Sequence, residues 1–188
     1  MHLQHPARLV AVRGRLMKAW FQSSAKLVLG QGVAAARRQD GPGQDYRAAL
    51  CRWEDALFAA YPVGHQRMEY GDALALICDV FQSCGRPVPR LDLVSGFADP
   101  RVGGLADIAG NRILIETGCL YRFLVLHESA HLLVPEDRLH GPGFTYLVQY
   151  LYRACLGIPE GTVRALLARY GLPGHTALPD GAPLAAAA

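Results

Sequence analysis

The run HESAH at residues 127–131 constrains the fold of this chain more than any other part of it. Residues four apart lie on the same face of an α-helix, so from a helix the imidazoles of His127 and His131 can reach one Zn²⁺ at about 2.0–2.1 Å. Glu128 would then lie beside the metal, where its carboxylate can take a proton from a zinc-bound water. The largely apolar run at 121–126, directly before the motif, favours a buried helix. The pattern therefore predicts a helix that carries two metal ligands and a general base.

A catalytic zinc site usually has three protein ligands and an open position for water, so a third ligand must come from another part of the chain. His140, which opens the run HGPGF at 140–144, is the candidate we favour. Pro135 ends the motif helix near Val134, and Pro142 suits the first turn of a new helix, so a short loop can bring His140 back to the metal. A loop histidine without a ligand role is the alternative interpretation.

Of two other ligand patterns, the sequence excludes the metzincin pattern and fits the gluzincin pattern less well. A metzincin would have glycine at position 134 and histidine at position 137, where this chain has Val134 and Asp137. A gluzincin would take a glutamate from a following helix, and Glu160 is the candidate, because Glu136 lies too soon after the motif helix. His127, His131 and His140 are therefore the predicted zinc ligands, with Glu160 as the less favoured third ligand.

Length and composition favour one globular domain. The chain has 188 residues, of which 51% are hydrophobic, so it can bury a core and does not resemble a disordered protein. The number of cysteines is odd and none forms a CxxC pair, which argues against a disulfide framework and against an accessory zinc ribbon. We expect buried free thiols and a cytoplasmic protein; the five cysteines are Cys51, Cys78, Cys84, Cys119 and Cys155.

The basic charge is concentrated at the N-terminus. Residues 1–38 contain seven Lys or Arg and no Asp or Glu. Such a segment can contact nucleic acid or another anionic surface, and a solvated extension is the alternative. With a turn-forming run DGPG at 40–43, we expect a basic extension at 1–40, a folded domain at 44–172 and a disordered tail at 173–188. No transmembrane segment is expected, because no apolar run approaches about 20 residues.

Hydrophobic periodicity indicates a mixed fold. We expect helices at 44–60, 70–83, 144–155 and 160–170, besides the motif helix, and strands at 91–94, 103–108 and 112–116. Ala109-Gly110-Asn111 is a plausible hairpin turn between the last two strands. Tyr146 and Tyr150 are interpreted as core aromatics, with stabilisation of an oxyanion by a tyrosine as the alternative. The fold class is therefore α+β, with a small antiparallel sheet before the motif helix.

The runs HESAHLL and HGPGF together resemble the HExxH…HGPxF pattern of small bacterial zinc metallohydrolases that are related to SprT-like minimal zincins. Residues 46–55 and 103–107 are similar to the opening helix and to a glycine-led strand of that group, so the resemblance covers about 44–172. It implies a minimal zincin-like domain, in which a small antiparallel sheet packs with the HExxH helix and flanking helices. It further implies a zinc-dependent metallopeptidase whose polypeptide substrate lies along an edge strand, which we place within 103–108.

The alternative from another class is a zinc-stabilised module that binds nucleic acid or protein without catalysis. The feature against it is Glu128, since a structural zinc site needs no base and tends to be closed by a fourth protein ligand.

Overall fold

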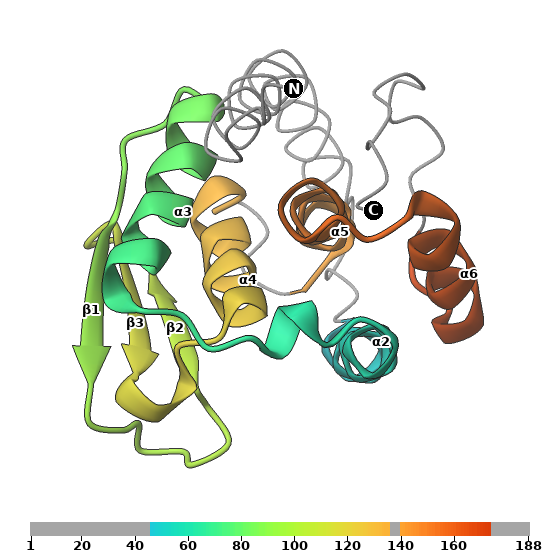
Figure 1. Cartoon of the computed structure of the whole chain (residues 1–188), viewed down its shortest axis with the longest axis horizontal. Helices are drawn as coiled ribbons and strands as arrows, with labels where there is room; N and C mark the ends of the chain where they lie inside the picture. Colours follow the sequence, from blue (N-terminus) through green and yellow to red (C-terminus); the bar gives the residue numbers. More distant parts are fainter. Residues whose placement is uncertain (1–45, 136–139, 174–188) are drawn as a thin grey trace, which may run out of the picture.

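The computed structural model describes residues 46–135 and 140–173. Within them the chain forms five α-helices and one three-stranded sheet, which confirms the α+β class (Figure 1). The predicted extension at 1–40 lies outside the described residues, and so do Glu136, Asp137 and all of the predicted tail at 173–188 except Pro173.

The helices agree with the expectations from sequence, with small shifts at their ends. They are α2 (Arg47–Ala60), α3 (Tyr70–Ser83), α4 (Arg122–Leu133), α5 (Pro142–Leu156) and α6 (Glu160–Tyr170), with short 3-10 turns η1 (Pro62–His65) and η2 (Thr117–Cys119). The motif helix α4 ends where Pro135 was expected to end it, with Val134 as its C-cap, and Pro142 begins α5. The glycines at the ends of α5 and α6, Gly157 and Gly171, have positive φ angles of 69° and 66°.

The sheet consists of β1 (Arg90–Val94), β2 (Gly104–Asp107) and β3 (Arg112–Glu116), in the order β1-β3-β2. β2 and β3 form the predicted antiparallel hairpin, whereas β1 runs parallel to β3, so the prediction of an antiparallel sheet is wrong for β1. The physical reason is the strand order. The chain reverses direction between β1 and β2 and again between β2 and β3, and after two reversals β3 runs the same way as its neighbour β1.

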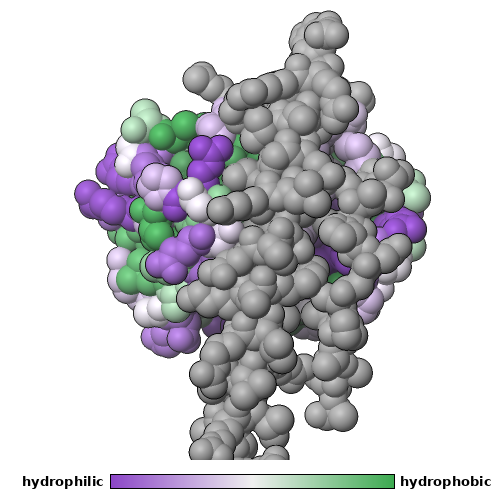
Figure 2. All heavy atoms as spheres, turned by 90° about the horizontal axis from the view of Figure 1, so that it is seen from above, coloured by the Kyte–Doolittle hydropathy of each residue, from purple (hydrophilic) through white to green (hydrophobic). Residues whose placement is uncertain are grey.

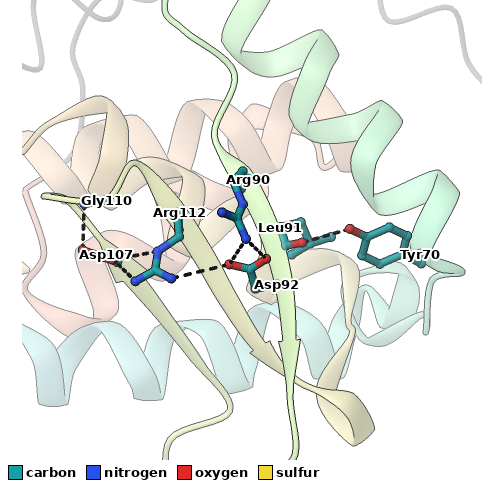
Figure 3. A network of polar contacts seen from close by, with 7 residues as sticks. All are labelled: Tyr70, Arg90, Leu91, Asp92, Asp107, Gly110 and Arg112. Carbon is teal, nitrogen blue, oxygen red and sulfur yellow. Dashed lines mark hydrogen bonds and ion pairs between the residues drawn. The ribbon is translucent and has the colours of Figure 1, made fainter.

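A tight turn joins β2 to β3 at the predicted position. Asn111 has a positive φ of 48°, a conformation that asparagine tolerates better than most residues. The Asp107 carboxylate accepts the Gly110 N–H at 2.9 Å and two N–H groups of Arg112 at 2.9 and 2.6 Å. Figure 3 shows that this network extends across the exposed face of the sheet to Asp92 and Arg90.

α4 lies in the middle of the fold. In Figure 1 the sheet and α3 lie on one side of it and α5 lies on the other, with α2 and α6 further from the sheet. Because apolar residues occur nearly all round α4, it can be buried on several faces. Five of its side chains are fully buried, namely Val125, Leu126, Ser129, Ala130 and Leu133. The motif residues are therefore carried by a largely buried helix that packs against the sheet.

All five cysteines are free thiols, as expected, but they are not all buried. Cys84 is buried, which raises the pKa of its thiol to about 11, while Cys51 is exposed on α2. The described surface mixes residue types, and Figure 2 shows hydrophilic and hydrophobic residues interspersed on the described part of one face. Among the described residues no helix is both long enough and apolar enough to cross a membrane.

Candidate metal centre

The structure brings together the three histidines that the sequence analysis selected. His127 and His131 lie one turn apart on α4, with ring centroids 5.2 Å from each other. His140 lies directly before Gly141, the N-cap of α5, and its ring centroid is 5.3 Å from that of His127 and 4.9 Å from that of His131. One nitrogen from each ring can be chosen so that all three lie within 4.8 Å of one another. This group could bind a metal ion.

The spacing of the ring nitrogens fits such a site. The Nε2 atoms of His127 and His140 are 3.3 Å apart. Two ligands of a tetrahedral Zn²⁺ at about 2.0–2.1 Å from the metal would be about 3.3–3.4 Å apart, so these two nitrogens lie at the separation that a shared metal requires. Among the described residues no fourth His, Cys, Asp or Glu joins the group, so this part of the chain offers three ligands there.

Phe144 packs against all three imidazoles. Its ring stacks on that of His131 at 4.1 Å, and its centroid is 5.0 Å from the His127 ring and 4.9 Å from the His140 ring. Phe144 is fully buried in the first turn of α5, which Pro142 begins. The run HGPGF therefore supplies both His140 and the aromatic ring that packs against His127 and His131.

Glu128 lies against the strand β2. Its side chain is buried, and its carboxylate accepts the backbone N–H of Ala106. A Cβ atom at Gly104 would lie 3.0 Å from both Cγ and Oε1 of Glu128, so only glycine allows the strand to approach this closely without displacement. Burial raises the pKa of Glu128, although the neighbouring His127 partly opposes this. A buried carboxylate of raised pKa is suited to accept and return a proton.

The histidines have unequal electrostatic surroundings. Burial, followed by repulsion from His127 and His140, lowers the pKa of His131 to about 2, so its imidazole is neutral. Burial also acts to lower the pKa of His127, but the carboxylates of Glu54 and Glu128 outweigh it, and the pKa of His127 is raised.

Glu54 is a residue of the centre that the sequence analysis did not identify. Its Oε1 atom lies 2.9 Å from Nδ1 of His127, and the Tyr152 hydroxyl donates to the same oxygen at 2.5 Å. The sequence contains one signal that could have found it. Glu54 lies on the apolar face of α2, between Trp53 and Leu57, where a charged residue needs a buried partner.

Three residues weighed in the sequence analysis lie elsewhere. Glu160, the alternative third ligand, begins α6 and pairs with Arg153 at 2.8 Å and with Arg164. Tyr146 and Tyr150 are buried and line the crevice between α5 and α6 together with Glu160, in agreement with their interpretation as core aromatics. None of the three belongs to the histidine group.

Comparisons of the chain with protein-family models, with curated proteins and with solved structures gave no match. The fold and site therefore define an α+β protein with a three-histidine group that could bind a metal ion, and its function must be argued from that geometry.

Proposed function

We propose that this protein is a zinc-dependent hydrolase and, within that class, a metallopeptidase. The observation that supports this most directly is the combination of His127, His131 and His140, which converge from two helices, with the buried carboxylate of Glu128 next to them. Three protein ligands and an adjacent carboxylate are the pattern of catalytic zinc sites, which keep a coordination position open. A structural zinc would not require Glu128.

His127, His131 and His140 would hold the metal, and zinc bound there would lower the pKa of a coordinated water toward about 7 and polarise a carbonyl. Glu128 would take the proton from the attacking water and deliver it to the leaving amine. The hydrogen bond from Ala106 N–H restrains the carboxylate for this task.

The backbone of β2 is suited to hold an extended peptide. In the β2–β3 register Gly104 pairs with Ile115 and Ala106 with Ile113, and Glu116 N–H donates to Gly103 O at 2.9 Å. In this antiparallel pattern the backbone groups of Gly104 and Ala106 point away from β3. Because the Ala106 N–H donates to Glu128, a substrate strand would use the Gly104 N–H and the carbonyl groups of Gly104 and Ala106. Among the described residues β2 pairs only with β3. A polypeptide substrate could therefore add to this edge, beside Glu128, by main-chain hydrogen bonds.

The basic segment at 1–38, proposed from sequence to contact nucleic acid, lies outside the described residues, so no described contact favours the non-catalytic alternative.

The test combines metal analysis with peptide hydrolysis on the full chain. The purified protein should contain about one zinc per chain. Glu128→Gln should retain the zinc and lose hydrolysis of a mixed fluorogenic peptide library, whereas His140→Ala should lose the zinc. Glu160→Gln is the matched control, because it alters a glutamate outside the histidine group, and it should keep both properties. Full zinc content in His140→Ala would overturn the three-histidine centre, and undiminished hydrolysis by Glu128→Gln would overturn the catalytic role.

A further inference from the structure

The two ring nitrogens of His127 face different partners. Nε2 lies 3.3 Å from Nε2 of His140, on the side of the candidate metal, and Nδ1 lies 2.9 Å from Oε1 of Glu54. An ionised carboxylate can only accept a hydrogen bond, so the proton of a neutral His127 must be on Nδ1. The lone pair of Nε2 then points to the other two histidines and is available to a metal.

Glu54 is itself held by a rigid aromatic side chain. Tyr152 on α5 is fully buried, and its hydroxyl donates to the same Oε1 atom at 2.5 Å. The Tyr152 ring stacks on Trp53 with centroids 5.8 Å apart and meets Phe58 edge-on at 5.1 Å. The hydroxyl therefore has little freedom to move, and it fixes the carboxylate oxygen that His127 uses.

The position of Glu54 on α2 makes a purely structural role a poor explanation. The other buried residues on this face are Leu50, Trp53, Leu57 and Phe58, all hydrophobic. Burying a carboxylate is costly unless it is fully paired, and an apolar residue would pack there at lower cost. Of the acidic side chains in the described residues, Glu54 and Glu128 are the two that are buried, and each lies beside His127.

We propose that Glu54, restrained by Tyr152, is a positioning residue of the metal centre: it holds the Nδ1–H of His127 and thereby presents Nε2 to the metal. The inference rests on the metal-binding role proposed above. Carboxylates that orient and polarise a ligating histidine in this way strengthen the metal site, and their loss typically costs about 10–100-fold in metal affinity or activity. α2 would thus belong to the centre although it carries none of the three histidines.

The test measures zinc affinity by competition with a chelator of known affinity, using the folded full chain. Glu54→Met removes the acceptor and should weaken zinc binding by about 10–100-fold. Glu54→Gln keeps an acceptor oxygen but loses the charge, so it should fall between Glu54→Met and the wild type. Tyr152→Phe keeps the aromatic packing and should weaken zinc binding by a smaller factor. Tyr150→Phe is the matched control on the same helix and should bind zinc as the wild type does.

Two further measurements separate positioning from a structural role. Unfolding of each metal-free variant by denaturant reports stability independently of zinc; a structural role predicts lower stability with unchanged zinc affinity in the folded state. Long-range ¹H–¹⁵N spectra of the zinc-loaded wild type should show His127 protonated at Nδ1.

The results that would overturn the positioning role of Glu54 differ from those that would overturn the proposed metal centre. If the wild type binds no zinc, the metal centre itself fails. If the wild type binds zinc and the folded Glu54 and Tyr152 variants match it, or if Nδ1 of His127 is the metal-bound nitrogen, the positioning role is wrong. Should Glu54→Met not fold, Glu54→Gln and Tyr152→Phe still decide the question.

Discussion

Glu54 and Asp107 make similar hydrogen bonds in very different surroundings. Glu54 accepts from His127 and Tyr152 in the buried region around α4, at 2.9 and 2.5 Å. Asp107 accepts from Gly110 and Arg112 on the exposed face of the sheet, at 2.6–2.9 Å (Figure 3). Distances alone would rank the two carboxylates equally. Burial separates them, because a buried group that loses its partner cannot turn to water instead.

β2 contributes residues to both regions. Because side chains alternate along a strand, Gly104 and Ala106 face α4 and Glu128, while Leu105 and Asp107 belong to the exposed face. The comparison therefore predicts that neighbouring positions in β2 differ sharply in their tolerance to substitution.

The largest effect on stability is expected from Phe144→Ala. Phe144 is fully buried against the three imidazoles, and truncating such a ring typically costs about 3–5 kcal/mol. Leu105→Ala is the paired control, because Leu105 is 49% exposed and its truncation should change stability by less than about 0.5 kcal/mol. Urea unfolding of the metal-free protein measures both. If Phe144→Ala and Leu105→Ala lost equal stability, burial would not explain the difference between the region around α4 and the exposed face of the sheet.

Gly104→Ala should reduce catalysis more than stability. The added Cβ would lie 3.0 Å from Glu128 and from Cδ1 of Ile115, so the carboxylate must shift by a few tenths of an ångström. Small misplacements of a catalytic group are costly, and we expect about a tenfold loss of peptide hydrolysis with zinc retained. Gly161→Ala is the control, since a Cβ there meets open space. Normal hydrolysis by Gly104→Ala would mean that contact between β2 and Glu128 is not needed.

Asp107→Asn should have the smallest effect on stability, and this effect should disappear at acid pH. The hydrogen bond from Gly110, followed by those from Arg112, lowers the pKa of Asp107 below its ordinary value of 3.8. A carboxyl with a lowered pKa adds stability above the unfolded-state value, and this is lost as the pH falls through the folded-state value. The melting temperatures of wild type and Asp107→Asn should therefore differ slightly at pH 7 and converge as the pH falls through the lowered folded-state pKa of Asp107. A difference that grows toward acid pH would contradict this assignment.

The fold could be predicted from sequence wherever local patterns govern it. The helices followed from hydrophobic periodicity, and the hairpin between β2 and β3 followed from the turn residues at 109–111. The partner of β1 could not be predicted in this way, because β1 pairs with a strand that is not its neighbour in the chain. The hydrophobic pattern of the sequence predicted each strand, but the order of the strands in the sheet depends on packing against α3 and α4.

In the candidate site, too, local sequence patterns predict some features and tertiary packing decides the others. The sequence by itself determined that His127, Glu128 and His131 share one stretch of helix, because residues four apart in an α-helix are always neighbours. It also indicated that His140 could return to them, since the break at Pro135 and the helix start at Pro142 leave only a short loop. Only the tertiary structure decided that Glu54 and Tyr152 complete the surroundings of His127. They lie 98 residues apart in the chain, and no local rule relates them, so their contact arises solely from the packing of α2 and α5 around α4.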